Sequence, residues 1–181
     1  SWADVASPKW KGKILLDDPR AIGGGYLMFF TQWVAPGLGE KFHEAVNANE
    51  PVMTRDPPAA ARRIARGELS LYMPFILPDI ANHNGLPVKP IIPAEGAPFV
   101  LYGNVLMRNA PHPNAARLYM DFLMSEDAQM MWGRTGMGVV REGLAEKIPA
   151  EVRATANAKL LGTTDPDRQD EAMGVAKRIY K

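Results

Sequence analysis

Three consecutive glycines, at positions 23–25, follow an apolar run and lead directly into a stretch with helical character. A strand-to-helix turn without side chains leaves backbone N–H groups exposed at the positive end of a helix dipole, and such groups bind anions. The alternative is that these glycines only allow a tight turn and close packing. The chemistry indicated is recognition of a negatively charged group by peptide amides, without a covalent step.

Side chains near the turn could add to this recognition. Arg20 could pair with a carboxylate or phosphonate through its planar guanidinium, or it could be a solvated turn residue. Tyr26 directly follows the glycines and is placed to touch a ligand. Tyr72 stands on an apolar strand, where it could line a cleft or be a core residue whose hydroxyl is satisfied.

Residue patterns for other chemistry do not occur. The histidines, His43, His83 and His112, have no partner at the i, i+4 spacing of a helical zinc site. There is no cysteine, no Gly-x-Ser-x-Gly elbow, no P-loop lysine and no Gly-x-Gly-x-x-Gly motif. Asp17 and Asp18 are adjacent, so an extended backbone points them to opposite sides, which argues against a paired acid and base. We predict no enzyme, no cofactor and no metal site.

Composition limits the possible partners. The 181 residues, 46% of them hydrophobic and 23% charged, suffice for one ordinary domain or two small lobes. A formal net charge of +1 gives no basic field of the kind that binds nucleic acid. No apolar run reaches the ~20 residues that cross a bilayer, and a chain without cysteine suits both cytosol and periplasm. Charge therefore identifies no partner.

Prolines and glycines divide the first two thirds of the chain into alternating strands and helices. After a first strand that begins at Lys13, the expected helices cover residues 26–34, 38–48, 59–66 and 79–84, and the expected strands cover 69–73, 88–93 and 99–107. Pro90 and Pro93 cannot donate to a ladder, which places 88–93 at a sheet edge. This alternation predicts an α/β fold with a mostly parallel sheet flanked by helices.

The last third is expected to be helical. One face of a helix that begins at Pro113 carries apolar residues at three- and four-residue spacing: Ala115, Leu118, Tyr119, Phe122 and Leu123. Ser125 caps a second helix, with acidic residues in its first turn and its end at Gly133. Residues 142–181 predict further helical segments.

Five sets of residues occur in a characteristic order. They are SWADV at 1–5 with PKWKGKI at 8–14, DPR at 18–20 before the glycine turn, GE at 67–68 before an apolar strand, APHPNAAR at 110–117, and SEDAQ at 125–129. Together they resemble periplasmic solute-binding proteins of ABC transporters, in the branch that includes ferric-ion binders. The resemblance covers residues 1–140 and implies the type II periplasmic binding fold, in which two α/β lobes joined by crossing strands capture a ligand between them.

This resemblance implies a domain organisation and a function. The chain would begin after the first crossover, with residues 1–98 forming the second lobe and residues 99–181 the returning crossover strand and the helical remainder of the first lobe. Such a protein is the periplasmic receptor of an importer, closing on a small anionic or organic solute, or a metal complex, and delivering it to an ABC permease in the inner membrane. Its partners are the small-molecule ligand and the permease, with no nucleic acid. An exposed cleft face and open sheet edges would favour pairing with another copy of this piece.

Site residues are implied position by position. Family members bind an oxyanion in the turn after the Asp-Pro pair with a small hydroxyl residue, a glycine and backbone amides, and here Ile22 replaces the hydroxyl residue while the amides remain. The ligand-binding residues predicted are Arg20, Ile22, Gly23, Gly24, Gly25, Tyr26 and Tyr72. The adjacent tyrosines of ferric binders would fall at Leu77 and Pro78, so we expect no iron.

Two other classes of protein share this architecture. An enzyme on the same two-lobe scaffold would need a nucleophile or an acid and base facing the glycine turn, and none has recognisable spacing here. A ligand-sensing domain of a transcription regulator is disfavoured because the sequence shows no DNA-binding helix-turn-helix. A binding module that works by cleft closure is the preferred interpretation.

Overall fold

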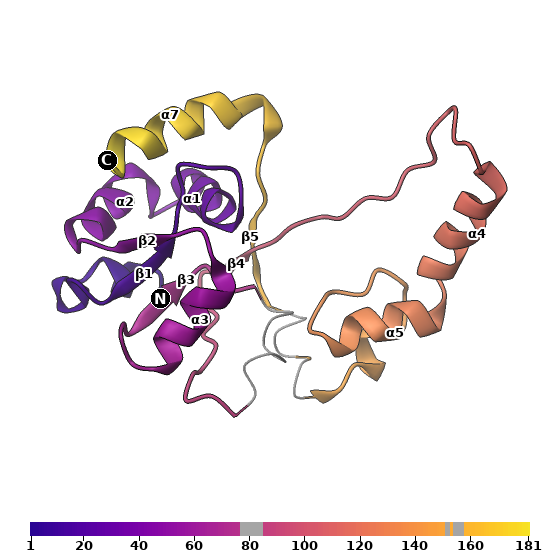
Figure 1. Ribbon diagram of the computed structural model, residues 1–181, viewed down its shortest axis with the longest axis horizontal. Coiled ribbons are helices and arrows are strands. Elements are labelled where there is room, and N and C mark those ends of the chain that lie inside the picture. Colours follow the sequence, from indigo (N-terminus) through magenta and orange to yellow (C-terminus); the bar gives the residue numbers. More distant parts are fainter. Residues whose placement is uncertain (77–84, 151–152, 154–157) are drawn as a thin grey trace. The chain divides into compact units, whose positions relative to one another are not determined.

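The computed structural model describes residues 1–76, 85–150, 153 and 158–181, and contacts divide them into two units (Figure 1). The first unit comprises residues 1–76, 85–100 and 159–181, and the second comprises 101–150, 153 and 158. The expected helix over 79–84 and the positions of Leu77 and Pro78 lie outside the described residues.

A three-stranded parallel sheet forms the centre of the first unit. Its strands, in spatial order, are β2 (Val52–Thr54), β1 (Ile14–Asp17) and β3 (Leu71–Met73). In the central strand, Leu15 is paired with Val52 on one side and Tyr72 on the other. Because all three strands run in the same direction, their carboxyl ends meet at one edge, called here the carboxyl edge.

Helices cover both faces of this sheet. They are α1 (Gly24–Val34) and α2 (Gly39–Ala48) between β1 and β2, α3 (Pro57–Ala65) between β2 and β3, and α7 (Gln169–Ile179) near the end of the chain. Ile14 and Leu16 face the core formed with α1, α2 and α7, whereas Leu15 points to the opposite face and packs with Ala60 of α3. Figure 1 shows α1, α2 and α7 on one side of the sheet and α3 on the other.

Local sequence signals explain where these helices begin. The Asp56 carboxylate accepts a hydrogen bond from the Ala59 amide, and Pro57 occupies the first helical position, where no amide donor is needed. The start of α1 has no side-chain cap from its own N-cap residue, Gly23, and its first turn is bound instead by a residue of β1. α1 therefore depends on the strand before it for its N-terminal hydrogen bond.

Short elements complete the first unit. They are the 3₁₀ turns η1 (Ala3–Ala6), η2 (Pro8–Trp10) and η5 (Pro166–Arg168), and the parallel pair β4 (Ala97–Pro98) and β5 (Leu160–Gly162). The Trp2 indole is buried and donates from Nε1 to the Gly96 carbonyl over 2.9 Å, while the Ser1 hydroxyl donates to Glu95. These bonds fasten the first residues of the chain to the segment that leads into β4.

The second unit is built from α4 (Pro113–Leu123), α5 (Glu126–Arg134) and the 3₁₀ turn η4 (Ala145–Lys147). Ser125 caps α5, its hydroxyl accepting from the Ala128 amide over 3.3 Å, as the sequence predicted. Gly133 packs closely on Ile148, since a Cβ on that glycine would lie 3.0 Å from Ile148 Cγ1. α4 has no buried residue, and on its predicted apolar face Leu118, Tyr119 and Phe122 are exposed while Leu123 is half-buried.

The α/β fold class is confirmed, with helices close to the ranges expected over 26–34, 38–48 and 59–66. Two expected strands are wrong, because neither the described residues 88–93 nor residues 99–107 form a strand. The strand β4 (Ala97–Pro98) lies just before the second range, and after it the Phe99 amide donates to the Gly162 carbonyl at the end of β5 over 3.0 Å. Pro90 and Pro93 have no backbone N–H group to donate to a neighbouring strand. The residues after Phe99 have apolar side chains, but their backbone is not paired with a strand among the described residues. The short β2 was not expected.

The position of the chain's end differs from the expected domain division. We expected all of 99–181 to belong with the other lobe, but β5 and α7 pack into the first unit with residues 1–76. The cause is visible in the core, where Ala172, Ala176 and Tyr180 are buried beside α1 and α2. The assignment of the remaining segment, 101–158, to the first lobe stays a prediction.

Candidate functional site

The carboxyl edge of the sheet brings together charged residues from separate parts of the chain. β1 ends in Asp17 and continues to Asp18, whose amide donates to the Thr54 carbonyl at the end of β2 over 2.9 Å. Arg55 follows Thr54, and Pro74 follows β3. In open α/β sheets, ligands bind outside the carboxyl ends of the strands, so this edge is the place where a site is expected.

The glycine turn lies at this edge, and the Gly25 amide is hydrogen-bonded to a residue of β1. Its amide donates to Asp17 Oδ2 over 2.8 Å, so an internal carboxylate occupies part of the positive end of α1. A Cβ on Gly25 would lie 2.2 Å from the Asp17 carbonyl oxygen, which only glycine avoids. For Gly25 the structure therefore shows the close-packing role that the sequence left open.

Gly24 is also close to β1, though less tightly held. A Cβ there would lie 3.1 Å from Asp17 Oδ2 and 3.4 Å from Pro74 Cγ. Burial raises the pKa of Asp17, while the hydrogen bond from Gly25 acts in the opposite direction. Ile22 and Gly23 are exposed, with Ile22 72% accessible, so this part of the turn faces solvent.

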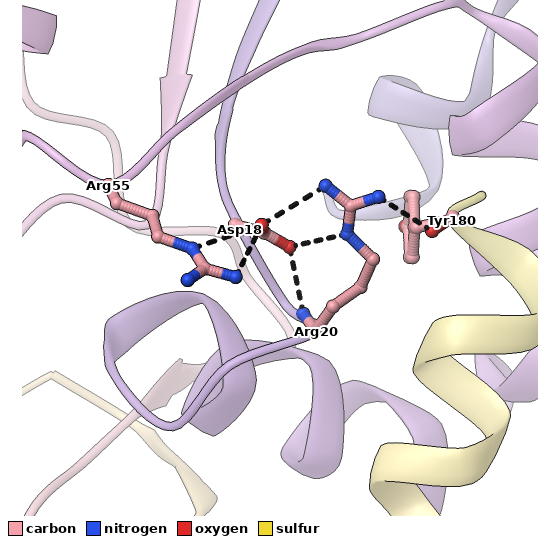
Figure 2. A network of polar contacts seen from close by, with 4 residues as sticks. All are labelled: Asp18, Arg20, Arg55 and Tyr180. Atoms are coloured by element: carbon pink, nitrogen blue, oxygen red, sulfur yellow. Dashed lines mark hydrogen bonds and ion pairs between the residues drawn. The ribbon is translucent and has the colours of Figure 1, made fainter.

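Asp18 is itself buried and is the centre of a partly buried ionic network (Figure 2). Its Oδ1 accepts from Arg20 Nε over 2.8 Å and from the Arg20 amide over 3.0 Å, and its Oδ2 accepts from Arg20 Nη2 over 3.1 Å. Arg55 donates to the same Oδ2 from Nε and Nη2, over 3.2 and 3.0 Å. These contacts, led by the Arg20 side chain, lower the pKa of Asp18 to about 2.

Arg20 has a structural role in this network. Besides binding Asp18 it donates from Nη1 to the Tyr180 carbonyl over 3.2 Å, which ties the turn after β1 to the end of α7. Arg20 is therefore not a freely solvated turn residue, and its role as a ligand contact stays a prediction. Figure 2 shows Arg20 and Arg55 on opposite sides of the Asp18 carboxylate.

Of the two predicted tyrosines, Tyr26 is buried and Tyr72 is half-buried. Tyr26 is 4% accessible, and burial, followed by the charges of Asp165 and Asp170, raises its pKa, so its hydroxyl lies on the side of η5 and α7. No hydrogen-bond partner for that hydroxyl is found within the described residues. Tyr72 is half-buried and packs against the cluster that contains Leu15 and Ala60. Their roles as ligand contacts stay predictions.

Arg55 is the residue at this edge that the sequence did not indicate. It follows a strand of only three residues, Val52–Thr54, which is too short to give a clear alternation pattern. Recognising β2 as a parallel neighbour of β1 would have placed Arg55 beside Asp18. The site therefore combines a predicted turn with an unpredicted arginine.

Comparison with known proteins identifies the family of this chain. The chain belongs to the bacterial extracellular solute-binding proteins, whose family model matches residues 1–138. It is 27% identical over 154 residues to an uncharacterized protein of Haemophilus influenzae strain Rd. The match covers 82% of this chain and 44% of the relative, so the chain spans less than half of that relative's length.

Over residues 1–76, 85–150 and 158–181, no helix combines the length and apolar character needed to cross a membrane. In the same part of the chain, no three His, Asp or Glu side chains are grouped so that they could hold a metal ion.

Proposed function

We propose that this chain is part of the substrate-binding component of an ABC importer that works in the periplasm. It captures a small anionic or organic solute in a cleft between two lobes and delivers it to a membrane permease. Membership of the extracellular solute-binding family is the observation that supports this proposal most strongly. No covalent step is needed, because the ligand acts by shifting an equilibrium between open and closed lobes.

We place the solute at the carboxyl edge of the β2-β1-β3 sheet. Ile22 and Gly23 expose the turn there, and Gly24 lies in the first turn of α1, where a helix has no internal acceptor for its amide. Arg55 adds an exposed positive charge at the end of β2. An anion at this edge would meet backbone donors and a guanidinium together.

We also propose that residues 101–158 belong to the other lobe and are completed by polypeptide beyond these 181 residues. Support comes from α4, where Leu118 is 71%, Tyr119 59% and Phe122 51% accessible on one face. A relative more than twice as long as the matched region offers enough chain to cover that face. Uncovered apolar surface of this kind is unusual on a finished domain.

A thermal-shift screen of the full natural polypeptide containing this sequence tests the proposal. The solutes are phosphonates, carboxylates, polyamines and metal chelates, each at a concentration far above the expected Kd. Binding to the folded state alone stabilises by about 2.7 kcal/mol at a hundredfold excess over Kd, which gives a clear rise in melting temperature. One solute class should produce that rise; a flat response to every class would contradict a solute-binding role.

A pair of matched variants locates the site in the same assay. Gly24→Leu would push a side chain into the space beside Asp17 and Pro74 and should remove the shift. Gly138→Leu is the control, because a Cβ at that exposed glycine of the second unit meets nothing within 4 Å. An undiminished shift in Gly24→Leu would remove the turn from the site.

A further inference from the structure

Two arginines share one carboxylate at the carboxyl edge, and they do so unequally. The Asp18 side chain is 6% accessible, that of Arg20 31% and that of Arg55 66%. Arg20 uses all three of its guanidinium nitrogens, two on Asp18 and one on the Tyr180 carbonyl. Arg55 uses only Nε and Nη2, both on a single oxygen of Asp18. Its Nη1 has no acceptor among the described residues.

We propose that Arg55 is the side chain that binds the solute, and that its ligand carries a carboxylate or phosphoryl group. Arg20 is a positioning residue, since it holds Asp18, and Asp18 in turn holds one edge of Arg55. This inference deepens the proposed function and rests on it. It also changes the assignment made from the sequence, in which Arg20 was the candidate cation.

Charge pairing supports this division. The bidentate contact from Arg20 already matches the single charge of Asp18, so the charge of Arg55 exceeds what Asp18 requires. Asp17, the other carboxylate here, is hydrogen-bonded to Gly25 and feels Arg55 only through its charge. An ion pair as exposed as that of Arg55 adds little to fold stability. Because Asp17 and Asp18 together balance Arg20 and Arg55, an anion would bind through the exposed donors of Arg55 and not through an excess of positive charge.

The orientation of the Arg55 guanidinium also supports its role in binding the solute. Asp18 holds Arg55 at the edge next to Asp17, and Asp17 in turn contacts the glycine turn. A guanidinium fixed on one side keeps its remaining donors in a planar fork, which suits two oxygens of one anionic group. Because the side chain is already oriented, less conformational entropy is lost when the ligand binds.

Isothermal titration of the full natural polypeptide with inorganic phosphate and, separately, with succinate tests the proposal. Arg55→Gln should raise the Kd of the anion that binds by about tenfold or more, because it removes a charge-assisted contact. Its melting temperature without ligand should stay close to that of the unmodified protein. Arg55→Lys keeps the charge without the fork and should give an intermediate Kd.

The matched control is Arg62→Gln, which removes the same charge from an exposed position on α3. It should leave the Kd unchanged. Equal Kd values for Arg55→Gln and the unmodified protein would overturn the inference and leave solute binding intact. Binding of a polyamine or a neutral solute, with no response to phosphate or succinate, would do the same. If no solute of any class binds, the proposed function itself fails, and this inference fails with it.

Discussion

The amide of Gly25 and the carboxylate of Asp17 lie 2.8 Å apart, which joins the start of α1 to the end of β1. This bond satisfies one of the donors that a helix leaves open in its first turn and places a negative charge at its positive end. It also requires the two backbones to approach so closely that no side chain fits on Gly25.

Replacing Gly25 with alanine should strongly destabilise the first unit. The new Cβ would lie 2.2 Å from the Asp17 carbonyl oxygen, so the helix and strand must move apart. Overpacking of this kind costs about 3 kcal/mol or more when backbone atoms are the obstacle. Urea unfolding followed by far-UV circular dichroism measures the loss.

Gly174→Ala is the control for that experiment. Gly174 lies exposed within α7, and a Cβ there meets nothing within 4 Å. Alanine should leave stability unchanged or raise it by about 1 kcal/mol through helix propensity. Equal urea midpoints for Gly25→Ala and Gly174→Ala would contradict the close approach between the backbones of Gly25 and Asp17.

Of the two arginines that bind Asp18, Arg20 should contribute more to the free energy of unfolding than Arg55. Arg20→Gln loses the contacts to Asp18 and to the Tyr180 carbonyl, and it leaves a buried carboxylate poorly compensated. We expect a loss of about 2 kcal/mol in the free energy of unfolding, against less than about 1 kcal/mol for Arg55→Gln. Chemical denaturation at pH 7 compares them, and a larger loss for Arg55→Gln would contradict the positioning role of Arg20.

Acidification should destabilise the first unit through His43. Its ring is 1% accessible, its Nδ1 lies 2.9 Å from the Tyr180 hydroxyl, and burial lowers its pKa from 6.5 to about 4. Between those values the unfolded chain binds a proton that the folded chain does not, so stability is full above pH 6.5 and falls as pH drops toward 4. The loss is at most about 3 kcal/mol.

Unfolding curves at several pH values between 7 and 4 measure this dependence. His43→Phe preserves an aromatic ring beside Phe29 and should flatten the slope over that range. His112→Gln, at an exposed position, serves as the control and should keep the slope of the unmodified protein. A slope that survives in His43→Phe would assign the effect to other groups.

The apolar face of α4 should drive self-association when this chain is studied alone. Leu118 and Phe122 are exposed on it, and burying them between copies is favourable. Sedimentation velocity over a range of concentrations should show association that Leu118→Glu combined with Phe122→Glu removes. Arg117→Glu, on the same helix but outside the apolar set, should leave it in place. Association that is unaffected by the double variant would place the contact elsewhere.

Local patterns predicted much of this fold. The glycine run, the proline at the start of α3 and the serine before α5 each act within a few residues, so the sequence alone located those turns and helix starts. The alternation of strands and helices was likewise sufficient for the α/β class with a parallel sheet.

Contacts between distant residues could not be predicted in this way. Arg20 meets the carbonyl of Tyr180, 160 residues away, and no local pattern encodes that pairing. Residues 99–107 have the composition of a strand, yet Leu101, Tyr102 and Val105 are exposed because a strand also needs a partner. Arg55 was missed because β2 is too short to recognise without its neighbour β1.

The central claim is that the solute binds at the carboxyl edge of the β2-β1-β3 sheet. The most direct test is to find which residues change their environment when the solute binds. ¹⁵N–¹H correlation spectra of the labelled protein, recorded during titration with the solute that raises its melting temperature most, report on each amide and on arginine Nε–H groups. We predict that the largest shifts occur at Gly23, Gly24 and Arg55, around the carboxyl edge. Shifts confined to α7 or to the second unit, with those three signals unmoved, would contradict the claim.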